Sequence, residues 1–374
     1  MALHERSIAI NKRSIAIKKG VACAVACAAL LTSSTSAIAA SPQKRAALGT
    51  RYVVTRQHKN GSFPGFSALG ATADAVLSLA AAARGQGAID KAIAYLKANV
   101  DSASLGQKAK IALAAVAAGK DPRSFGGHNL LKEIKASQKP SGRYAEKGDF
   151  TAVITHSLAM IALEAGGAKA SAKAQMWLRD AQCPDGGWQY DGPRHKGENR
   201  HCFDAKSGND FSTTDTNTTS YGVQALVATH THLAFKTNPF KYFASARDDL
   251  GGWRYSYKRS SGGATTYMDA NSTALVLQAF AAEGKALPGR GIRALEKLQY
   301  RKCGSLEGAF ARTWEKRGGK LHRSPSIKDA KAEKSADGPT VIGATVGAIP
   351  GLLGDPLPIS HTTTTTAPPA RKSC

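Results

Sequence analysis

Acidic residues are scarce in this sequence of 374 residues, which has 27 Asp and Glu against 51 Lys and Arg. It contains no aspartate-rich cluster that would hold Mg²⁺ against a diphosphate, which excludes that chemistry. The formal net charge of +24 makes an anionic cell-wall polymer or an acidic polysaccharide an expected partner. Nucleic acid is not expected, because the sequence has no motif for its recognition.

Long hydrophobic runs are also missing, so we expect no transmembrane segment. The run from Val21 to Leu31 is too short to cross a bilayer. It follows a segment with five Lys and Arg against one Glu, and Ala37 to Ala39 provide small residues for cleavage. This order predicts a secretory signal peptide over residues 1–39 and a secreted or cell-surface protein.

Cysteine is rare, with six in the whole sequence. Removal of the signal peptide would leave Cys183, Cys202, Cys303 and Cys374. We expect a disulfide between Cys183 and Cys202, because export favours oxidation and the bond would close a long polar loop. His195 and His201 make the same loop a zinc candidate, but the disulfide is favoured, and we expect no metal and no cofactor. The pairing of Cys303 and Cys374 stays open.

The sequence does contain a repeated pattern: an apolar residue, Gln or Arg four positions later, Gly four later, and an aromatic two later. The Gln or Arg and the aromatic of each copy are Gln57 and Phe63, Gln138 and Tyr144, Gln182 and Trp188, and Arg247 and Trp253. A looser copy has Gln299, Gly308 and Phe310. Such recurrence predicts a repeat architecture. We expect the Gln to bond a neighbouring helix end and the aromatic to wedge between adjacent hairpins.

Each copy separates two helices of different character. The helix before the Gln is amphipathic, whereas the one after the aromatic is apolar on nearly every side and should be the inner of the pair. Six such pairs fit between Ala46 and Gly354, which predicts an all-α fold, an (α/α)6 toroid around an axial cavity. Residues 355–374 are rich in Thr and Pro and predict a linker or tail.

The repeat resembles the "QW" repeat of terpenoid cyclases, and the helical region looks like their α/α toroid, which protein prenyltransferases share. The stretch from Asp215 to Leu226 resembles the Asp-x-Asp-Asp-Thr segment of squalene-hopene-type cyclases. In that family the middle aspartate protonates an alkene. Here Asn217 takes its place, and Asn271 does so in the next repeat. An amide cannot act as a general acid, so we expect no catalytic residue at these positions.

Two interpretations of these segments stay open. In the first, Asp215 and Asp269 cap inner helices, where the dipole favours the ionised carboxylate. In the second, the segments line a ligand site at the cavity mouth. The candidate ligand residues are Asp215, Asn217, Asp269, Asn271, Tyr190, Tyr255 and His156.

Three functions follow from these observations. We favour a secreted non-catalytic toroid that binds a small ligand, of the isoprenoid or corrinoid type known from the fold, or an anionic surface polymer. The first alternative is a terpenoid cyclase that uses an unidentified acid. The second is a polysaccharide-active enzyme on a similar toroid.

Overall fold

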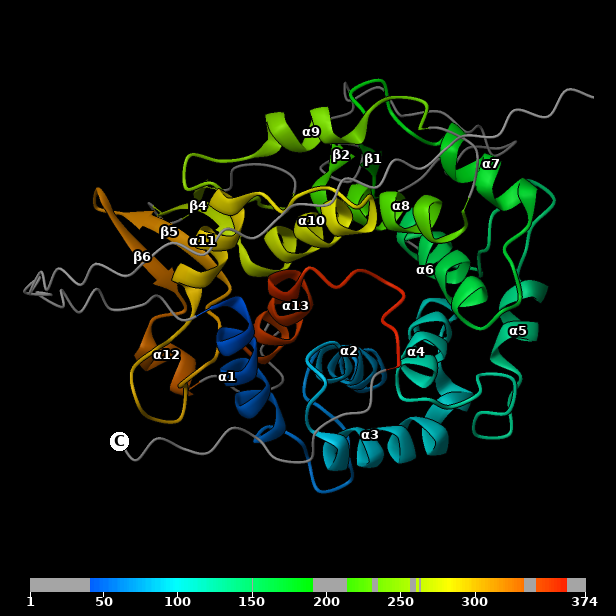
Figure 1. Cartoon of the computed structure of the whole chain (residues 1–374), viewed down its shortest axis with the longest axis horizontal. Coiled ribbons are helices and arrows are strands. Elements are labelled where there is room, and N and C mark those ends of the chain that lie inside the picture. The colour runs from blue at the N-terminus through cyan, green and yellow to red at the C-terminus, as the bar shows by residue number, and fades with distance from the viewer. Residues whose placement is uncertain are drawn as a thin grey trace, which may run out of the picture. The chain divides into compact units, whose positions relative to one another are not determined.

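The protein is described from a computed structural model that covers residues 41–149, 151–190, 214–230, 235–255, 260–261, 264–332 and 341–361. The predicted signal peptide lies outside these residues. Residues 40–374 form one unit built around two layers of helices (Figure 1). The outer helices are α1 (Pro42–Val54), α3 (Gln86–Asn99), α5 (Leu130–Ala136), α7 (Ala172–Asp180), α9 (Pro239–Ala246) and α11 (Gly289–Leu298). The inner helices are α2 (Ala68–Ala81), α4 (Leu105–Ala117), α6 (Ala152–Ala165), α8 (Thr216–Ala228), α10 (Ala270–Ala282) and α13 (Val341–Leu353).

The inner helices form a closed ring. Each packs against the next in the order α2, α4, α6, α8, α10 and α13, and α13 packs back against α2. The predicted all-α toroid of six hairpins is therefore confirmed. Val76, Ile161, Val223 and Val276, one on each of four inner helices, are fully buried as expected.

The glutamine of the repeat, where it is present, joins its hairpin to the next. Gln182 Nε2 donates to the carbonyl of Gly186 in its own turn at 2.8 Å and to that of Thr237, just before α9, at 2.6 Å. Gln299 Nε2 donates in the same way to Gly308 O at 3.0 Å and to Arg45 O at 2.9 Å. Arg45 lies in α1, so this last pair of bonds closes the ring between the two ends of the repeat. Gln57 and Gln138 make the equivalent bonds to Gly61 and Ala88, and to Gly142 and Ser171.

The aromatic of each repeat is anchored to its own inner helix. Trp188 and Trp253 are buried and donate their indole N–H to carbonyls of the preceding outer helix. The backbone N–H of each aromatic donates to a side chain on the inner helix that follows. These pairs are Phe63 with Thr72, Tyr144 with His156, Trp188 with Thr219, Trp253 with Thr273, and Phe310 with Thr345, all at 2.9–3.0 Å. Arg247, in the fourth copy, makes no such bond among the described residues and only ends α9.

Strands occur where none was predicted. β3 (Ser260–Ser261), β4 (Ala264–Asp269), β5 (Thr313–Arg317) and β6 (Lys320–Ser324) form an antiparallel sheet in that order. β1 (Trp188–Gln189) pairs with β2 (Thr214–Asp215), η1 covers Val100–Ser102, and α12 covers Ile327–Ala332. The β5–β6 turn is Gly318-Gly319, both with positive φ, which is a hairpin signal. This signal is present in the sequence, but the repeat pattern alone does not point to it.

The start of the predicted tail packs on the ring instead of leaving it. Leu357 N donates to Gln224 Oε1 of α8 at 2.9 Å, and Gln278 Nε2 of α10 donates to Asp355 O at 2.8 Å. Leu357 and Ile359 are buried. In Figure 1 this red segment crosses from α13 toward α4, where His361 Nδ1 lies 3.1 Å from Ala117 O. The chain therefore crosses the ring at the C-terminal ends of the inner helices.

No helix in the described part of the chain has both the length and the apolar character to span a bilayer.

The turn glycines allow a test of the bonds between hairpins. A Cβ on Gly308, with φ +89°, would lie 2.3 Å from Leu48 O, whereas Gly127, with φ +85°, has open space around its Cβ position. We expect Gly127→Ala to cost about 1 kcal/mol for its backbone conformation alone. Gly308→Ala should cost at least about 2 kcal/mol more, because a carbonyl must move. Urea unfolding measures both, and equal costs would contradict the role of Gly308 in closing the ring.

Candidate functional site

A polar layer faces the axis of the ring about halfway along the inner helices. Lys110 Nζ of α4 lies 2.8 Å from Asp74 Oδ2 of α2, and their side chains are 24% and 38% exposed. Solvent therefore reaches this pair. Tyr221 of α8 interacts electrostatically with both residues, although α8 is three helices along the ring from α2. Interaction across that separation places all three side chains toward the axis.

The charge on Lys110 is fixed by its partners. Burial lowers the pKa of Lys110. The hydrogen bond to Asp74 and the electrostatic interactions with Asp74 and Tyr221 together raise this pKa above its ordinary value. Burial raises the pKa of the Tyr221 hydroxyl, which therefore stays neutral. The layer thus offers an ammonium, a carboxylate and a neutral phenol to whatever occupies the axis. The sequence signal that was missed is the pair of charged residues Asp74 and Lys110 near the middle of two mostly apolar inner helices.

Asn217 lies on the same face of α8. Residues 217, 221 and 224 recur at the spacing of one helix face, and Tyr221 and Gln224 face the axis and the crossing tail respectively. The Oδ1 atom of Asn217 is one of eleven buried side-chain nitrogen and oxygen atoms that have no hydrogen-bond partner within the described residues. Buried polar atoms are nearly always bonded, so an unpaired amide oxygen here needs an explanation. Its counterpart Asn271 is exposed at the start of α10, beside Gly347 of α13.

Asp215 and Asp269 cap inner helices, as one of the two interpretations held. Asp215 Oδ1 accepts from Thr218 N, and Asp269 Oδ1 accepts from Ser272 N, both at 2.7 Å. Burial opposes the expected effect of the helix dipole, because it raises the pKa of Asp215 to about 7 and that of Asp269 to about 6. Desolvation outweighs the hydrogen bonds that favour the carboxylates. The charge of Asp215 helps to raise the pKa of Tyr242 on outer helix α9, so the Asp215 carboxyl lies on the outer side of the ring.

The remaining candidates divide into two groups. Tyr190 and Tyr255 are partly exposed, and their rings meet edge to face with centroids 6.2 Å apart beside the start of α8. His156 is fully buried, accepting from Tyr144 N at 2.9 Å and bonding Ala174 O at 3.0 Å. Burial lowers its pKa to about 3, so the ring is neutral and joins the turn before α6 to α7 of the next hairpin. Both ring nitrogens are in use, which leaves none for a ligand.

The cysteine loop is described only in part. Cys183 is buried, and Cys183 and Cys303 are each disulfide-bonded. Cys202 and Cys374 lie outside the described residues, as do His195 and His201, so the pairing of Cys183 with Cys202 stays a prediction. Among the residues that are described, no group of three His, Cys, Asp or Glu side chains is placed to hold a metal ion.

The ring geometry can now be compared with known proteins. No family model matches the chain, and no curated protein matches it. An arginine variant of type II terpene cyclase MstE from Scytonema, in complex with geranylgeranyl dihydroxybenzoate, is similar with a TM-score of 0.53 at 12% identity, over 84% of this chain and 97% of that one. The chain has the α/α-toroid fold of the terpenoid cyclases.

Two further solved structures share this toroid. MstE in its apo form has a TM-score of 0.52 at 13% identity, covering 83% of this chain and 98% of its own. An inactive variant of an α-1,6-mannanase of Salegentibacter, in complex with α-1,6-mannotetrose, has a TM-score of 0.51 at 14% identity, covering 84% of this chain and 100% of its own. At these identities the likeness is one of fold, and the toroid alone does not choose between such ligands.

The pH dependence of stability tests the burial of Asp215. Between about pH 4 and 7 the folded protein keeps a proton that the unfolded chain releases, so stability falls as pH rises through this range. Asn217 and Thr218 donate to the same cap oxygen, and Asp215→Asn preserves an acceptor there. We expect the variant to gain about 2 kcal/mol relative to the wild type between pH 5 and pH 8.

Urea unfolding of both proteins at the two pH values measures this difference. His156 has the opposite effect, because its lowered pKa means that stability is lost as pH falls below about 6.5. The comparison therefore uses the difference between variant and wild type, in which the contribution of His156 cancels. Parallel pH profiles for the two proteins would show that Asp215 titrates normally.

Proposed function

We propose that the protein binds a hydroxyl-rich small ligand, of the oligosaccharide type, along the axis of its ring and does no chemistry on it. The observation that carries this proposal is the unpaired Oδ1 atom of Asn217, on the face of α8 that also presents Tyr221 toward Lys110 and Asp74. Ligand hydroxyls bond to the phenol and the ion pair, and one that reached the Asn217 amide would supply the donor that its oxygen lacks.

The ion pair argues against a purely hydrocarbon ligand. A hydrocarbon in the axis would strip water from Lys110 and Asp74 without replacing its hydrogen bonds, and this desolvation costs several kcal/mol per ion. A polyhydroxylated ligand avoids that cost because it bonds to both groups. The mannotetrose complex of the mannanase is consistent with an oligosaccharide bound on a ring of this kind.

The same residues argue against catalysis. Hydrolysis of a glycoside needs two carboxyl groups placed on either side of the bond. Within the described residues of the inner helices, Asp74 is the carboxylate placed toward the axis, and it is already paired with Lys110. Asp215 has the raised pKa of a general acid, but it lies toward α9 and not toward the axis. A cyclase would also need an acid where Asn217 stands.

Calorimetry with two probes tests this proposal. We expect α-1,6-mannotetrose to bind and geranylgeranyl dihydroxybenzoate not to bind. Asn217→Leu should weaken binding of the sugar at least tenfold, because a buried polar contact is lost, and Tyr221→Phe should weaken it several-fold. Lys135→Gln, on the exposed face of outer helix α5, serves as the control and should leave affinity unchanged.

Binding of the prenyl compound in place of the sugar would contradict the proposal. Sugar binding that is equally strong in the wild type and in Asn217→Leu would place the site elsewhere. Release of shorter sugars during the titration, detected by mass spectrometry, would contradict the claim that the protein does no chemistry.

A further inference from the structure

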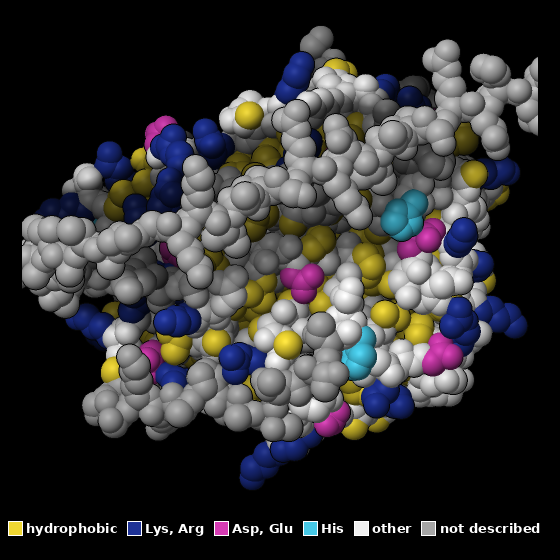
Figure 2. Space-filling model, viewed as in Figure 1, with side chains coloured by type: hydrophobic (Ala, Val, Ile, Leu, Met, Phe, Trp, Pro, Cys, Tyr) yellow, Lys and Arg dark blue, Asp and Glu magenta, His cyan; other side chains and the backbone are white. Residues whose placement is uncertain are grey.

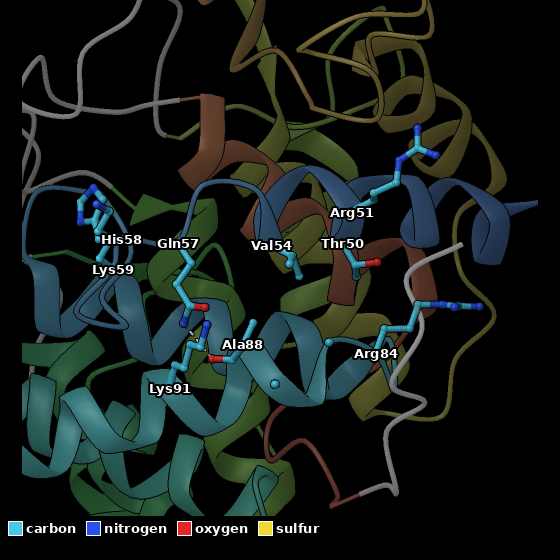
Figure 3. A pocket seen from close by; sticks show the side chains of 11 residues that line it. Thr50, Arg51, Val54, Gln57, His58, Lys59, Arg84, Ala88 and Lys91 are labelled. Atoms are coloured by element: carbon cyan, nitrogen blue, oxygen red, sulfur yellow. Dashed lines mark hydrogen bonds between the residues drawn. The ribbon is translucent and has the colours of Figure 1, made fainter. Parts of the chain in front are cut away.

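A groove of about 450 Å³ lies between outer helices α1 and α3, in the outer layer of the ring (Figure 3). Its lining residues come from α1, the turn that follows α1, and the start of α3. Five of them are basic or imidazole side chains, and none is acidic: Arg51, His58, Lys59, Arg84 and Lys91. A concave surface lined by one sign of charge concentrates ligands of the opposite sign.

Two of these cations are available to a ligand. Lys59 and Lys91 are exposed, and within the described part of the chain neither makes an ion pair or a side-chain hydrogen bond. Arg51 is paired with Glu307 at 2.6 Å, so it contributes less charge to the groove. Lys and Arg side chains also lie around the rim of the face shown in Figure 2, but this groove adds a defined shape to that charge.

The charges are spread along the groove. In Figure 3, His58 and Lys59 lie at one end, Arg51 and Arg84 at the other, and Val54 and Ala88 between them. The middle is lined by small uncharged residues, including Gly85 and Gly87. Because Arg51 is paired with Glu307, the exposed Lys59 and Lys91 supply the available charge, and the long uncharged floor beside them suits an extended chain that carries anionic groups at intervals. A single small anion would contact only one end.

The first turn of α3 adds to this field. Gly85 caps α3 with no side-chain hydrogen bond, and the turn contains no acidic residue. The positive end of the helix dipole is therefore not neutralised by an acidic side chain in this turn. Because Gly85, Gly87 and Ala88 line the groove, this helix start opens onto it.

We propose that the groove between α1 and α3 binds a linear anionic polymer, whose phosphodiester or carboxylate groups contact Lys59, Lys91 and the start of α3. This site is separate from the axial site, so the protein would hold a surface polymer on its outer layer while its axis takes a small ligand. A result against polymer binding in the groove would leave small-ligand binding in the axis untouched, and the reverse also holds.

Gly87 offers a test that leaves the fold intact. A Cβ at this position meets nothing within 4 Å, its φ is not positive, and either Glu or Gln is a better helix former than Gly. Gly87→Glu places a negative charge in the groove, and Gly87→Gln places a neutral group of the same size there. Binding is measured at low and high salt with poly(glycerol phosphate) and polygalacturonate as the two polymers, and with inorganic phosphate.

We expect at least one polymer to bind in a salt-sensitive manner. Gly87→Glu should weaken that binding at least tenfold and Gly87→Gln at most threefold. Binding of the first polymer alone identifies phosphodiesters as the ligand, and binding of the second alone identifies carboxylates; either supports the proposal. A control, Lys132→Glu with Lys135→Glu on exposed positions of α5, should weaken binding at most threefold.

Three outcomes would overturn the proposal. The first is that neither polymer binds. The second is that the Glu and Gln variants of Gly87 bind the polymer equally well. The third is that inorganic phosphate binds as tightly as the polymer, which would indicate a site for a single anion. Loss of binding in the α5 control equal to that in Gly87→Glu would likewise show that general surface charge, and not the groove, holds the polymer.

Discussion

The ring depends on one hydrogen-bonded arrangement, in which a glutamine amide ties its own turn to the beginning of the next outer helix. At the closure, Gln299 reaches Arg45, and the Arg45–Glu296 ion pair at 3.1 Å joins the same two helices. The glycine of each turn brings the backbones close enough for this bond, as at Gly308 against Leu48. Four such glutamines, Gln57, Gln138, Gln182 and Gln299, join parts of the outer layer, and the last of them closes the ring.

That arrangement explains why the fold could be predicted from the sequence and the site largely could not. Gln, Gly and an aromatic at fixed spacing each have a backbone role, so their recurrence encodes the hairpins and their order. The Lys110–Asp74 pair is set by packing between helices that are far apart in the chain, and no local spacing records it. His156 shows the reverse: a histidine on an apolar helix suggested a ligand residue, but it occupies the position where other repeats use Thr to receive an aromatic N–H.

Burial changed the chemistry of the residues that were predicted. The caps at Asp215 and Asp269 were correctly anticipated from their place before inner helices, but the sequence does not show how far these carboxyls are buried away from water. Desolvation raises the pKa of both carboxyls above the ordinary value of aspartate, to about 7 for Asp215 and about 6 for Asp269. The Gly318-Gly319 pair is a hairpin signal in the sequence, but the charged residues around it drew attention away from a strand pair.

The central claim is that a polar layer across the axis selects a hydroxyl-rich ligand. The most direct test is native mass spectrometry of the full protein purified from its own source, followed by identification of any compound released on unfolding. The account predicts a retained polyhydroxylated compound that is lost from Asn217→Leu. A retained isoprenoid or other hydrocarbon would contradict it.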